Sequence, residues 1–522
     1  MADRTREVER ELAVEAAFAM PDLVGADAVA AVDEPQRHRL VTVYHDTPDL
    51  RLAREGITLR RREGGDDAGW HLELPARGEG ARTEVALPLR AGAVGAVPAE
   101  LVDLVTATTR RRALEPVAVL RTDRCSQVLR DADGGALAEV ALDDVAVLDV
   151  ADGLPTGAAL EGARVLTRFR EVAVEERRED EADRSVLAEV VARLEAAGAR
   201  PGRLVPKAVR ALGALATAPP DVPVLPDVDE RSPAADLVRS YVAQQVRALR
   251  AADVGVRQDE DDAVHQLRVA ARRLRSGLRT FRPLLAREWA DGLREELRWL
   301  AGELGGARDS EVLAERLAAD LERLPEGAGA PEAGRLLERR AARDGQAGRR
   351  AALEALRSER YVQLLDRLVA AVALPETTAR AARPCAEVLP PLVGAAWKGL
   401  AKRARALGDG VPEEEWHEVR KRAKQVRYAA EAVRPALGTP AKRFAAQVER
   451  VTEVLGDHQD AAVAAQSLEG FLHERSSARA AFALGALWEE QRRAAGRARA
   501  DFLALWPQVS AGKHRRWLRS GG

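Results

Sequence analysis

Cysteine, long apolar runs and net charge are all scarce in this sequence of 522 residues. Its two cysteines, Cys125 and Cys385, lie far apart, which excludes a disulfide framework. No run of about 18 apolar residues occurs and no signal-peptide core opens the chain, so we expect a cytoplasmic protein without a membrane partner. The formal net charge is −2, so the molecule as a whole is not a cationic binder of nucleic acids.

The length of the chain predicts two or more domains, because one hydrophobic core does not grow to this size. The segment APPDVPVLP at 218–226 can neither continue a helix nor form a central strand, and we interpret it as a short, stiff linker. The patterns before it are mostly those of strands, and those after it are almost wholly helical. The sequence therefore predicts a domain over 1–216, a linker over 217–231 and a helical domain over 232–519.

One charged pattern occurs twice in the helical half. His265 and His417 are each followed by cations three, seven and ten residues later, namely Arg268, Arg272 and Arg275 in one copy and Arg420, Lys424 and Arg427 in the other. Steps of three and four residues fall on one face of a helix, so each copy forms a basic stripe. Like charges at this spacing repel, and a polyanion would remove the repulsion. A solvated basic face is the alternative for a single stripe.

The match between the two copies extends beyond the stripes. RSGLRTFRP at 275–283 corresponds to RYAAEAVRP at 427–435, and LGGARD at 304–309 corresponds to LGDHQD at 455–460. We therefore predict an internal repeat over about 232–375 and 380–519. Four further cations are candidates for the same binding site: Arg273, Arg279, Arg308 and Lys421.

These motifs resemble those of the CHAD domain, the conserved histidine α-helical domain, over about Ser232 to Trp517. The resemblance implies two pseudo-symmetric four-helix bundles whose stripes line a central basic groove. It also implies that the domain binds inorganic polyphosphate. No nucleophile or acid/base pair in this half of the sequence indicates catalysis.

The N-terminal half predicts about eight strands, many of which carry charge on one alternate face. We expect strands at 6–14, 40–45, 57–63, 69–75, 82–89, 117–130, 136–148 and 164–176, and helices near 98–112 and 183–197. A closed antiparallel sheet with a polar interior explains this alternation better than a sandwich with a dry core. The expected fold class is therefore α+β with more than one domain.

The charged strand faces carry the residue types that phosphate chemistry needs. Carboxylates hold Mg²⁺ or Mn²⁺, and arginine forks grip phosphate oxygens. Together they serve metal-assisted phosphoryl transfer, whereas ordinary salt bridges between strands are the alternative. The pairs that share a face are Arg60 with Arg62, Arg82 with Glu84, Glu139 with Asp143, and Glu171 with Glu175.

The order of motifs in this half resembles the CYTH domain, whose members are also called triphosphate tunnel metalloenzymes. The motifs are Glu7 and Glu9, then YHDT at 44–47, LRRR at 59–62 and WHL at 70–72. The family includes triphosphatases, thiamine triphosphatases and class IV adenylate cyclases. The resemblance implies an eight-stranded antiparallel tunnel that holds Mg²⁺ or Mn²⁺.

The resemblance, together with the strand faces, assigns two sets of residues. The metal ligands would be Glu7, Glu9, Glu139, Asp143, Glu171 and Glu175. The triphosphate-binding cations would be Arg60, Arg62, Arg82, Arg121, Arg124 and Lys207. An unbroken strand cannot point both Arg121 and Arg124 inward, so this assignment expects a β-bulge between them.

Two positions depart from the family pattern, because Glu11 and Glu73 stand where a lysine is usual. The changes make the tunnel about four charges more negative, which weakens triphosphate binding by Coulomb repulsion. We therefore expect either a metal-dependent triphosphatase or a descendant that binds without turnover.

The sequence thus predicts a polyphosphate-binding protein whose tunnel hydrolyses tripolyphosphate or a nucleoside triphosphate, or only binds it. A non-catalytic module that could associate with polyphosphate granules is one alternative. A class IV-type adenylate cyclase and a nucleic-acid-binding protein are two others. The sequence shows no purine-reading pocket and no aromatic residues within the stripes, which argues against these last two.

Overall fold

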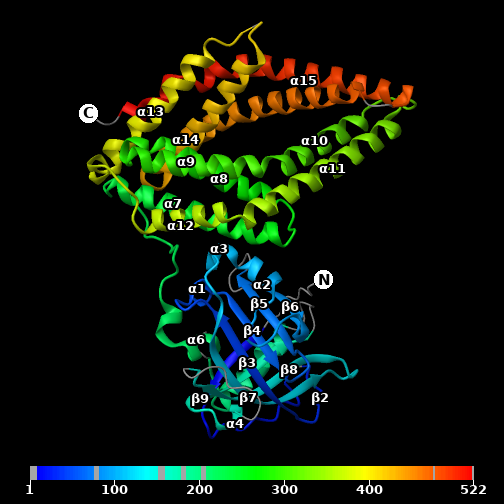
Figure 1. Ribbon diagram of the computed structural model, residues 1–522, viewed down its shortest axis with the longest axis vertical. Coiled ribbons are helices and arrows are strands. Elements are labelled where there is room, and N and C mark those ends of the chain that lie inside the picture. The colour runs from blue at the N-terminus through cyan, green and yellow to red at the C-terminus, as the bar shows by residue number, and fades with distance from the viewer. Residues whose placement is uncertain are drawn as a thin grey trace. The chain divides into compact units, whose positions relative to one another are not determined.

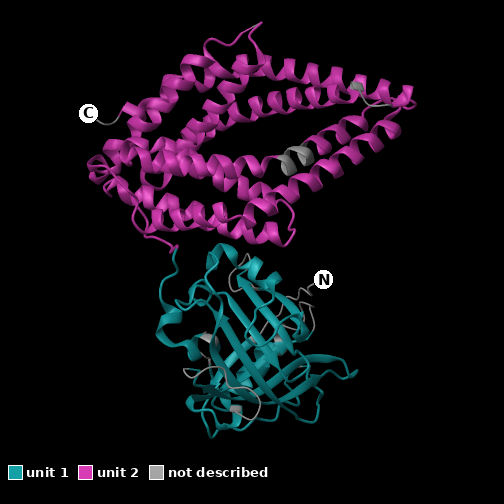
Figure 2. Cartoon of the chain, in the orientation of Figure 1, with its two compact units in different colours: residues 1–221 teal, residues 222–522 magenta. Residues whose placement is uncertain are grey.

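The chain divides into two compact units, residues 1–221 and 222–522 (Figure 2). The division falls inside the proline-rich segment. The computed structural model describes residues 9–26, 28–75, 82–150, 159–177, 184–201, 207–408, 410–473 and 476–519. None of the described helices combines the length and the apolar character that crossing a bilayer requires.

The first unit is built on one antiparallel sheet in the order β10-β1-β9-β8-β7-β3-β4-β5-β6, with β2 paired to β7 (Figure 1). The strands are β1 Glu9–Val14, β2 Ala31–Val32, β3 Gln36–Asp46, β4 Thr58–Glu63, β5 Gly69–Pro75, β6 Arg82–Pro88, β7 Glu115–Arg130, β8 Ala136–Leu148, β9 Val165–Glu176 and β10 Arg200–Pro201. The longer strands confirm the expected eight-stranded antiparallel fold. The two-residue strands β2 and β10 are additional.

Short helices flank the sheet, as expected. They are α1 Arg51–Arg54, α2 Ala99–Leu104, α3 Thr106–Thr109, α4 Ala159–Gly162, α5 Arg184–Ala196 and α6 Lys207–Leu212. The helix expected near 98–112 is divided into α2 and α3 at Val105, whose φ and ψ of −99° and 5° are not helical.

Alternation along the strands separates an apolar outer face from a charged inner face. Leu12, Val140 and Val174 of β1, β8 and β9 are buried together with Val190 and Leu194 of α5. Each buried aliphatic side chain contributes roughly 1.5–3 kcal/mol. A shift of the register by one residue would expose this cluster, so the core fixes which strand residues point inward.

The second unit is built from α-helices (Figure 1). They are α7 Ala234–Arg257, α8 Ala263–Thr280, α9 Arg287–Glu303, α10 Gly305–Leu321, α11 Ala330–Arg357, α12 Glu359–Ala373, α13 Cys385–Ala404, α14 Glu413–Glu469 and α15 Ala478–Val509. The sequence repeat makes α7 equivalent to α13, and α8 equivalent to the first part of α14. The second part of α14 corresponds to α9 and α10 together.

A short backbone bridge joins the starts of the two repeats. Pro233 and Pro384, which precede α7 and α13, pair in antiparallel orientation. Two hydrogen bonds of 3.0 and 2.9 Å close the bridge, from the Ala234 N–H to the Arg383 carbonyl and from the Cys385 N–H to the Ser232 carbonyl. Each bond becomes the other when the repeats are exchanged, so the bridge itself is locally two-fold symmetric.

Helix α14 changes direction at Gly438, whose φ and ψ of 59° and −135° are not helical. The break separates the part of α14 that corresponds to α8 from the part that corresponds to α9 and α10. Long hairpins follow in both repeats, α10 with α11 and α14 with α15 (Figure 1). Their far ends share an apolar cluster that includes Leu317, Leu337, Leu468 and Leu487.

The break predicts that Gly438→Ala destabilises the helical unit. A side chain in this backbone region costs about 1–3 kcal/mol, although no atom within 4 Å would obstruct the new Cβ. We expect a lower unfolding temperature in calorimetry of the full-length protein. Gly456→Ala in the same helix is the control, since its Cβ also meets nothing and alanine favours a helix by up to about 1 kcal/mol. Equal effects of the two substitutions would contradict the prediction.

Candidate functional sites

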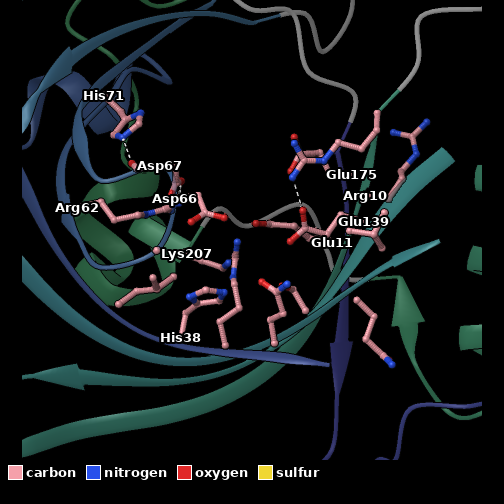
Figure 3. Close-up of a pocket in the computed structure, with 18 of the residues that line it drawn as sticks. Arg10, Glu11, His38, Arg62, Asp66, Asp67, His71, Glu139, Glu175 and Lys207 are labelled. Carbon is pink, nitrogen blue, oxygen red and sulfur yellow. Dashed lines mark hydrogen bonds and ion pairs between the residues drawn. The ribbon is translucent and has the colours of Figure 1, made fainter. Parts of the chain in front are cut away.

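The sheet of the first unit surrounds a cavity of about 800 Å³ (Figure 3). Residues that lie opposite each other on neighbouring antiparallel strands share a face. Arg124 of β7 lies opposite His38 of β3, and Arg60 of β4 lies opposite Tyr44 of β3. All four line the cavity, as does Lys207 at the start of α6.

The described residues that line the cavity have nearly balanced charge. Nine are carboxylates: Glu11, Asp33, Glu34, Asp66, Asp67, Glu73, Glu84, Glu139 and Glu175. Seven are cations: Arg10, Arg60, Arg62, Arg124, Arg130, Arg177 and Lys207. Positive charge in the cavity is therefore largely compensated by the protein itself.

The arginines expected to grip a triphosphate already bind carboxylates. Arg60 pairs with Glu73. Arg62 pairs with Asp67 of the loop between β4 and β5, and both are labelled in Figure 3. Glu73 is one of the two glutamates that replace a usual lysine, and it neutralises the neighbouring arginine. An incoming phosphate would have to compete with both carboxylates.

A second ion-paired group lies at the end of the cavity near α6. Asp143 is fully buried and accepts hydrogen bonds from Arg124 at 2.8 and 2.9 Å, and Lys207 Nζ lies 2.7 Å from its Oδ2. Lys207 also lies 2.7 Å from Glu171, which Arg210 approaches to 3.1 Å. Burial favours the neutral form of Asp143, but Lys207 and Arg124 outweigh it and hold its pKa well below the ordinary value.

This arrangement changes the expected roles of two carboxylates. Asp143 and Glu171 do not line the cavity, contrary to the expectation that they bind metal there. They lie behind Arg124 and Lys207 and hold these two cations in place. Both carboxylates are therefore already paired with protein cations, and a metal ion there would have to compete with Arg124, Lys207 and Arg210.

Three glutamates occupy one row across neighbouring strands. Glu9 of β1 lies opposite Glu175 of β9, and Glu175 lies opposite Glu139 of β8. Like charges directly opposite each other are destabilising, and a hard divalent cation with oxygen ligands would compensate them. Glu175 and Glu139 line the cavity, so the backbone register fits a metal ion there.

The described side chains alone do not complete this metal site. Among them, no three His, Cys, Asp or Glu side chains converge on a point that could hold a metal ion. Glu139 pairs with Arg177. Glu7 lies outside the described residues, and only the backbone positions of Glu9 and Arg82 are described.

Arg121 does not belong to the cavity. The pairing of β7 with β3 and β8 has no register shift between Arg121 and Arg124, so the expected bulge is absent from this described strand. Arg121 therefore points to the outer face, where it donates a hydrogen bond of 3.2 Å to the Leu160 carbonyl.

Sequence reasoning missed several residues of the cavity. His38 lies on β3, which begins at Gln36, before the strand expected from Leu40. The run QRHR has no apolar alternation, but pairing with β7 extends the strand through it. Arg130 and Arg177 also line the cavity and were missed. Arg130 follows the alternation of β7, and Arg177 lies one residue beyond the end of β9.

The two basic stripes of the second unit meet where α8 contacts α14. Arg272 Nε lies 3.2 Å from the Tyr428 hydroxyl, and Arg273 Nη2 lies 3.3 Å from Glu431. Lys424 lies among arginines of both repeats. Burial and the charges of Arg420, Arg272 and Arg427 lower its pKa to about 7, although Asp460 opposes the shift.

Other stripe residues have partners within their own repeat. Arg268 donates to the Gly305 carbonyl at 3.5 Å, Arg420 lies 3.7 Å from Asp460, and His417 hydrogen-bonds Gln459. His265 also interacts with its surroundings.

Two of the additional candidates lie at the margin of the stripes. Lys421 is exposed and lies 3.3 Å from Glu418. Arg308 lies on α10, where only the backbone is described. Sequence reasoning missed Arg294 and Arg298 of α9, whose charges reach Arg275. The sequence did contain a signal for them. Arg294 follows Arg287 by seven residues and Arg298 follows Arg294 by four, a spacing that places all three on one face of a helix.

Comparisons with known proteins agree with this division of the chain. Residues 5–210 match the CYTH domain, and residues 240–469 match the CHAD domain. The chain is 39% identical over 516 residues to the uncharacterized protein Rv2226 of Mycobacterium tuberculosis, strain ATCC 25618 / H37Rv, and the match covers 96% of each chain.

Two solved structures are each similar to about half of the chain. PptA from Streptomyces chartreusis is 29% identical, with a TM-score of 0.46, over 53% of this chain and 100% of that chain. The CHAD domain from the plant Ricinus communis is 26% identical, with a TM-score of 0.45, over 56% of this chain and 96% of that chain. On the two domain matches and the full-length relative, the chain belongs to the family of two-domain CYTH–CHAD proteins.

Proposed function

We propose that the helical unit binds inorganic polyphosphate at the basic cluster where α8 meets α14. The observation that carries the proposal is that the two basic stripes meet there, with Arg272 of α8 in contact with Tyr428 of α14. Burial, and then the charges of Arg420, Arg272 and Arg427, lower the pKa of Lys424 to about 7, in keeping with cations gathered in one place. Holding like charges together in a partly buried site costs free energy. A chain of phosphates would offset this cost by bringing many negative charges to one place.

The same cluster is poorly suited to a nucleic acid. Single-stranded nucleic acids stack their bases on exposed aromatic rings. Tyr428, the aromatic residue at the cluster, is 7% exposed, and Arg272 and Arg427 lie 6.0 and 5.7 Å from its ring centre. The ring therefore offers no free face to a base.

We propose further that the tunnel is a metal-dependent triphosphatase acting on tripolyphosphate or a nucleoside triphosphate. Glu9, Glu175 and Glu139 would hold Mg²⁺ or Mn²⁺, which would stabilise the developing negative charge. Arg124 and Lys207, fixed by the buried carboxylates behind them, would bind the phosphate chain, with Arg60 and Arg62 released from Glu73 and Asp67. The need to open these ion pairs favours slow turnover. A descendant that binds without hydrolysis is the second candidate.

The basic cluster predicts that replacing its central cations with alanine abolishes polyphosphate binding. Four contacts of roughly 1 kcal/mol each correspond to about a 1,000-fold loss of affinity, which isothermal titration calorimetry would measure. The variant carries Arg268→Ala, Arg272→Ala, Lys424→Ala and Arg427→Ala.

The matched control removes the same number of charges from exposed positions of α11: Arg335→Ala, Arg339→Ala, Arg343→Ala and Arg350→Ala. It should keep near-normal affinity. Equal losses in the two variants would mean that net charge, and not this cluster, binds the polyanion.

The pKa of Lys424 predicts that polyphosphate binding depends on pH. At pH 8 most Lys424 side chains are neutral in the free protein, and bound phosphate raises the pKa, so affinity should increase about tenfold from pH 8 to pH 6. In the absence of ligand, the stability of the folded protein depends on pH in the opposite direction. The unfolded chain holds this proton up to about pH 10.5, so the Lys424 contribution to stability increases from pH 7 to that value.

Lys424→Arg keeps the charge at every pH and should flatten the dependence of affinity on pH. Lys402→Arg, an exposed position of α13, should leave it unchanged. The prediction is wrong if Lys424→Arg retains the slope of the natural protein.

The tunnel predicts metal-dependent release of phosphate. Tripolyphosphate, ATP and long-chain polyphosphate would be compared with Mg²⁺, with Mn²⁺ and with chelator. Glu175→Gln should reduce release at least about tenfold, because it removes an oxygen donor from the glutamate row. Asp144→Asn, on the outer face of β8, is the control. Release from none of the three substrates would identify a binding-only tunnel, and cyclic AMP formed from ATP would identify a cyclase.

A further inference from the structure

The two repeats carry opposite charges at two equivalent positions. Arg279 of α8 corresponds to Glu431, and Arg298 of α9 corresponds to Glu449, both in α14. Buried apolar residues fix the alignment around the second pair, since Leu293, Leu297, Leu300 and Leu304 correspond to Phe444, Val448, Val451 and Leu455. The end of the basic stripe therefore differs between the repeats.

In the second repeat, the two glutamates close the end of the stripe. Arg427 lies 2.8 Å from Glu431 and 3.2 Å from Glu449, and it also donates to the Thr452 hydroxyl at 3.1 Å. Glu431 in addition pairs with Arg273 across the repeat boundary. The last cation of this stripe is thus paired with carboxylates on both parts of α14, which place negative charge just beyond it.

In the first repeat, the equivalent arginine is surrounded by cations. Burial lowers the pKa of Arg275, and so do the charges of Arg298, Arg294, Arg272 and Arg279. Among the described residues, no carboxylate forms an ion pair with Arg275. The end of this stripe therefore lacks the carboxylate partners, among the described residues, that its counterpart in the second repeat has.

The carboxylates near this open end are already engaged by other arginines and by a lysine. Glu418, which lies close enough to affect Arg279, is held by Lys421 at 3.3 Å and Arg422 at 3.1 Å. Asp291 accepts hydrogen bonds from Arg294 and Arg282 at 2.7 Å each. Positive charge remains in excess along the line from Arg275 to Arg298.

We infer that the polyphosphate site is one-sided: it continues from the central cluster over Arg275, Arg279 and Arg298 of the first repeat, and it ends at Glu431 and Glu449 of the second. This inference rests on the proposed binding of polyphosphate. Arg279 and Arg298 are exposed and can reach a ligand. The stripe from His265 to Arg279 runs along about 20 Å of helix, so only long phosphate chains would fill both the cluster and this extension.

The test is the affinity of the full-length protein for chains of different length. Arg279→Ala with Arg298→Ala should weaken binding of chains of tens of phosphates by about tenfold to thirtyfold. The dependence of log K on log salt should become shallower by about two units. Binding of tripolyphosphate, which fits within the central cluster, should change less than about twofold when it is measured with chelator, which prevents the proposed metal-dependent reaction in the tunnel.

Arg493→Ala with Arg497→Ala is the matched control, because it removes two exposed arginines of α15 that pair with Glu489 and Glu490. It should bind both ligands normally. Glu431→Gln with Glu449→Gln opens the second end and should strengthen long-chain binding. An increase of affinity cannot result from misfolding.

Three outcomes would overturn the inference. Unchanged long-chain binding in the Arg279/Arg298 variant removes the extension but leaves the proposed function intact, provided that the central four-residue variant still loses binding. Equal losses for short and long chains place both arginines in the central site. Absence of polyphosphate binding by the natural protein removes the proposed function and the extension together.

Discussion

Repulsion between cations held close together is the constraint on which both units depend. The sheet unit offsets this repulsion with its own carboxylates. Asp143 and Glu171 lie behind Arg124 and Lys207. Glu73 binds Arg60. In the helical unit, carboxylates offset only part of the repulsion between cations. Burial increases the free-energy cost of the positive charge that remains. The same residue types thus produce a self-compensated tunnel in one unit and a cation-rich cluster in the other, and this difference underlies the proposal that the cluster binds a polyanion. Under the proposed function, a triphosphate entering the tunnel would exchange one set of negative partners for another, so its net gain in free energy would be small compared with that of a polyanion on α8 and α14.

Much of this arrangement could be predicted from the sequence. A two-residue period gave β5 and β8 with their observed bounds, and the duplicated His/Arg pattern identified the helices that carry the cluster. The periodicity of the sequence could not predict which side chains become neighbours in the folded protein. Arg121 has the residue type of a ligand but the wrong strand parity, and His38 lies in a polar run that becomes a strand only by pairing with β7. Arg298 becomes a neighbour of Arg275 only through the packing of α9 on α8.

The bridge between Pro233 and Pro384 has a consequence for the history of the helical unit. Because it joins equivalent residues across an approximate two-fold axis, a single-repeat ancestor could have formed the same bridge between two copies of itself. A homodimer of that kind must carry identical side chains on both sides of its axis. Only within one chain can one side carry Arg279 and Arg298 while the other carries Glu431 and Glu449. Covalent linkage thus allows the two basic stripes to end differently, which a symmetric assembly of identical chains cannot do.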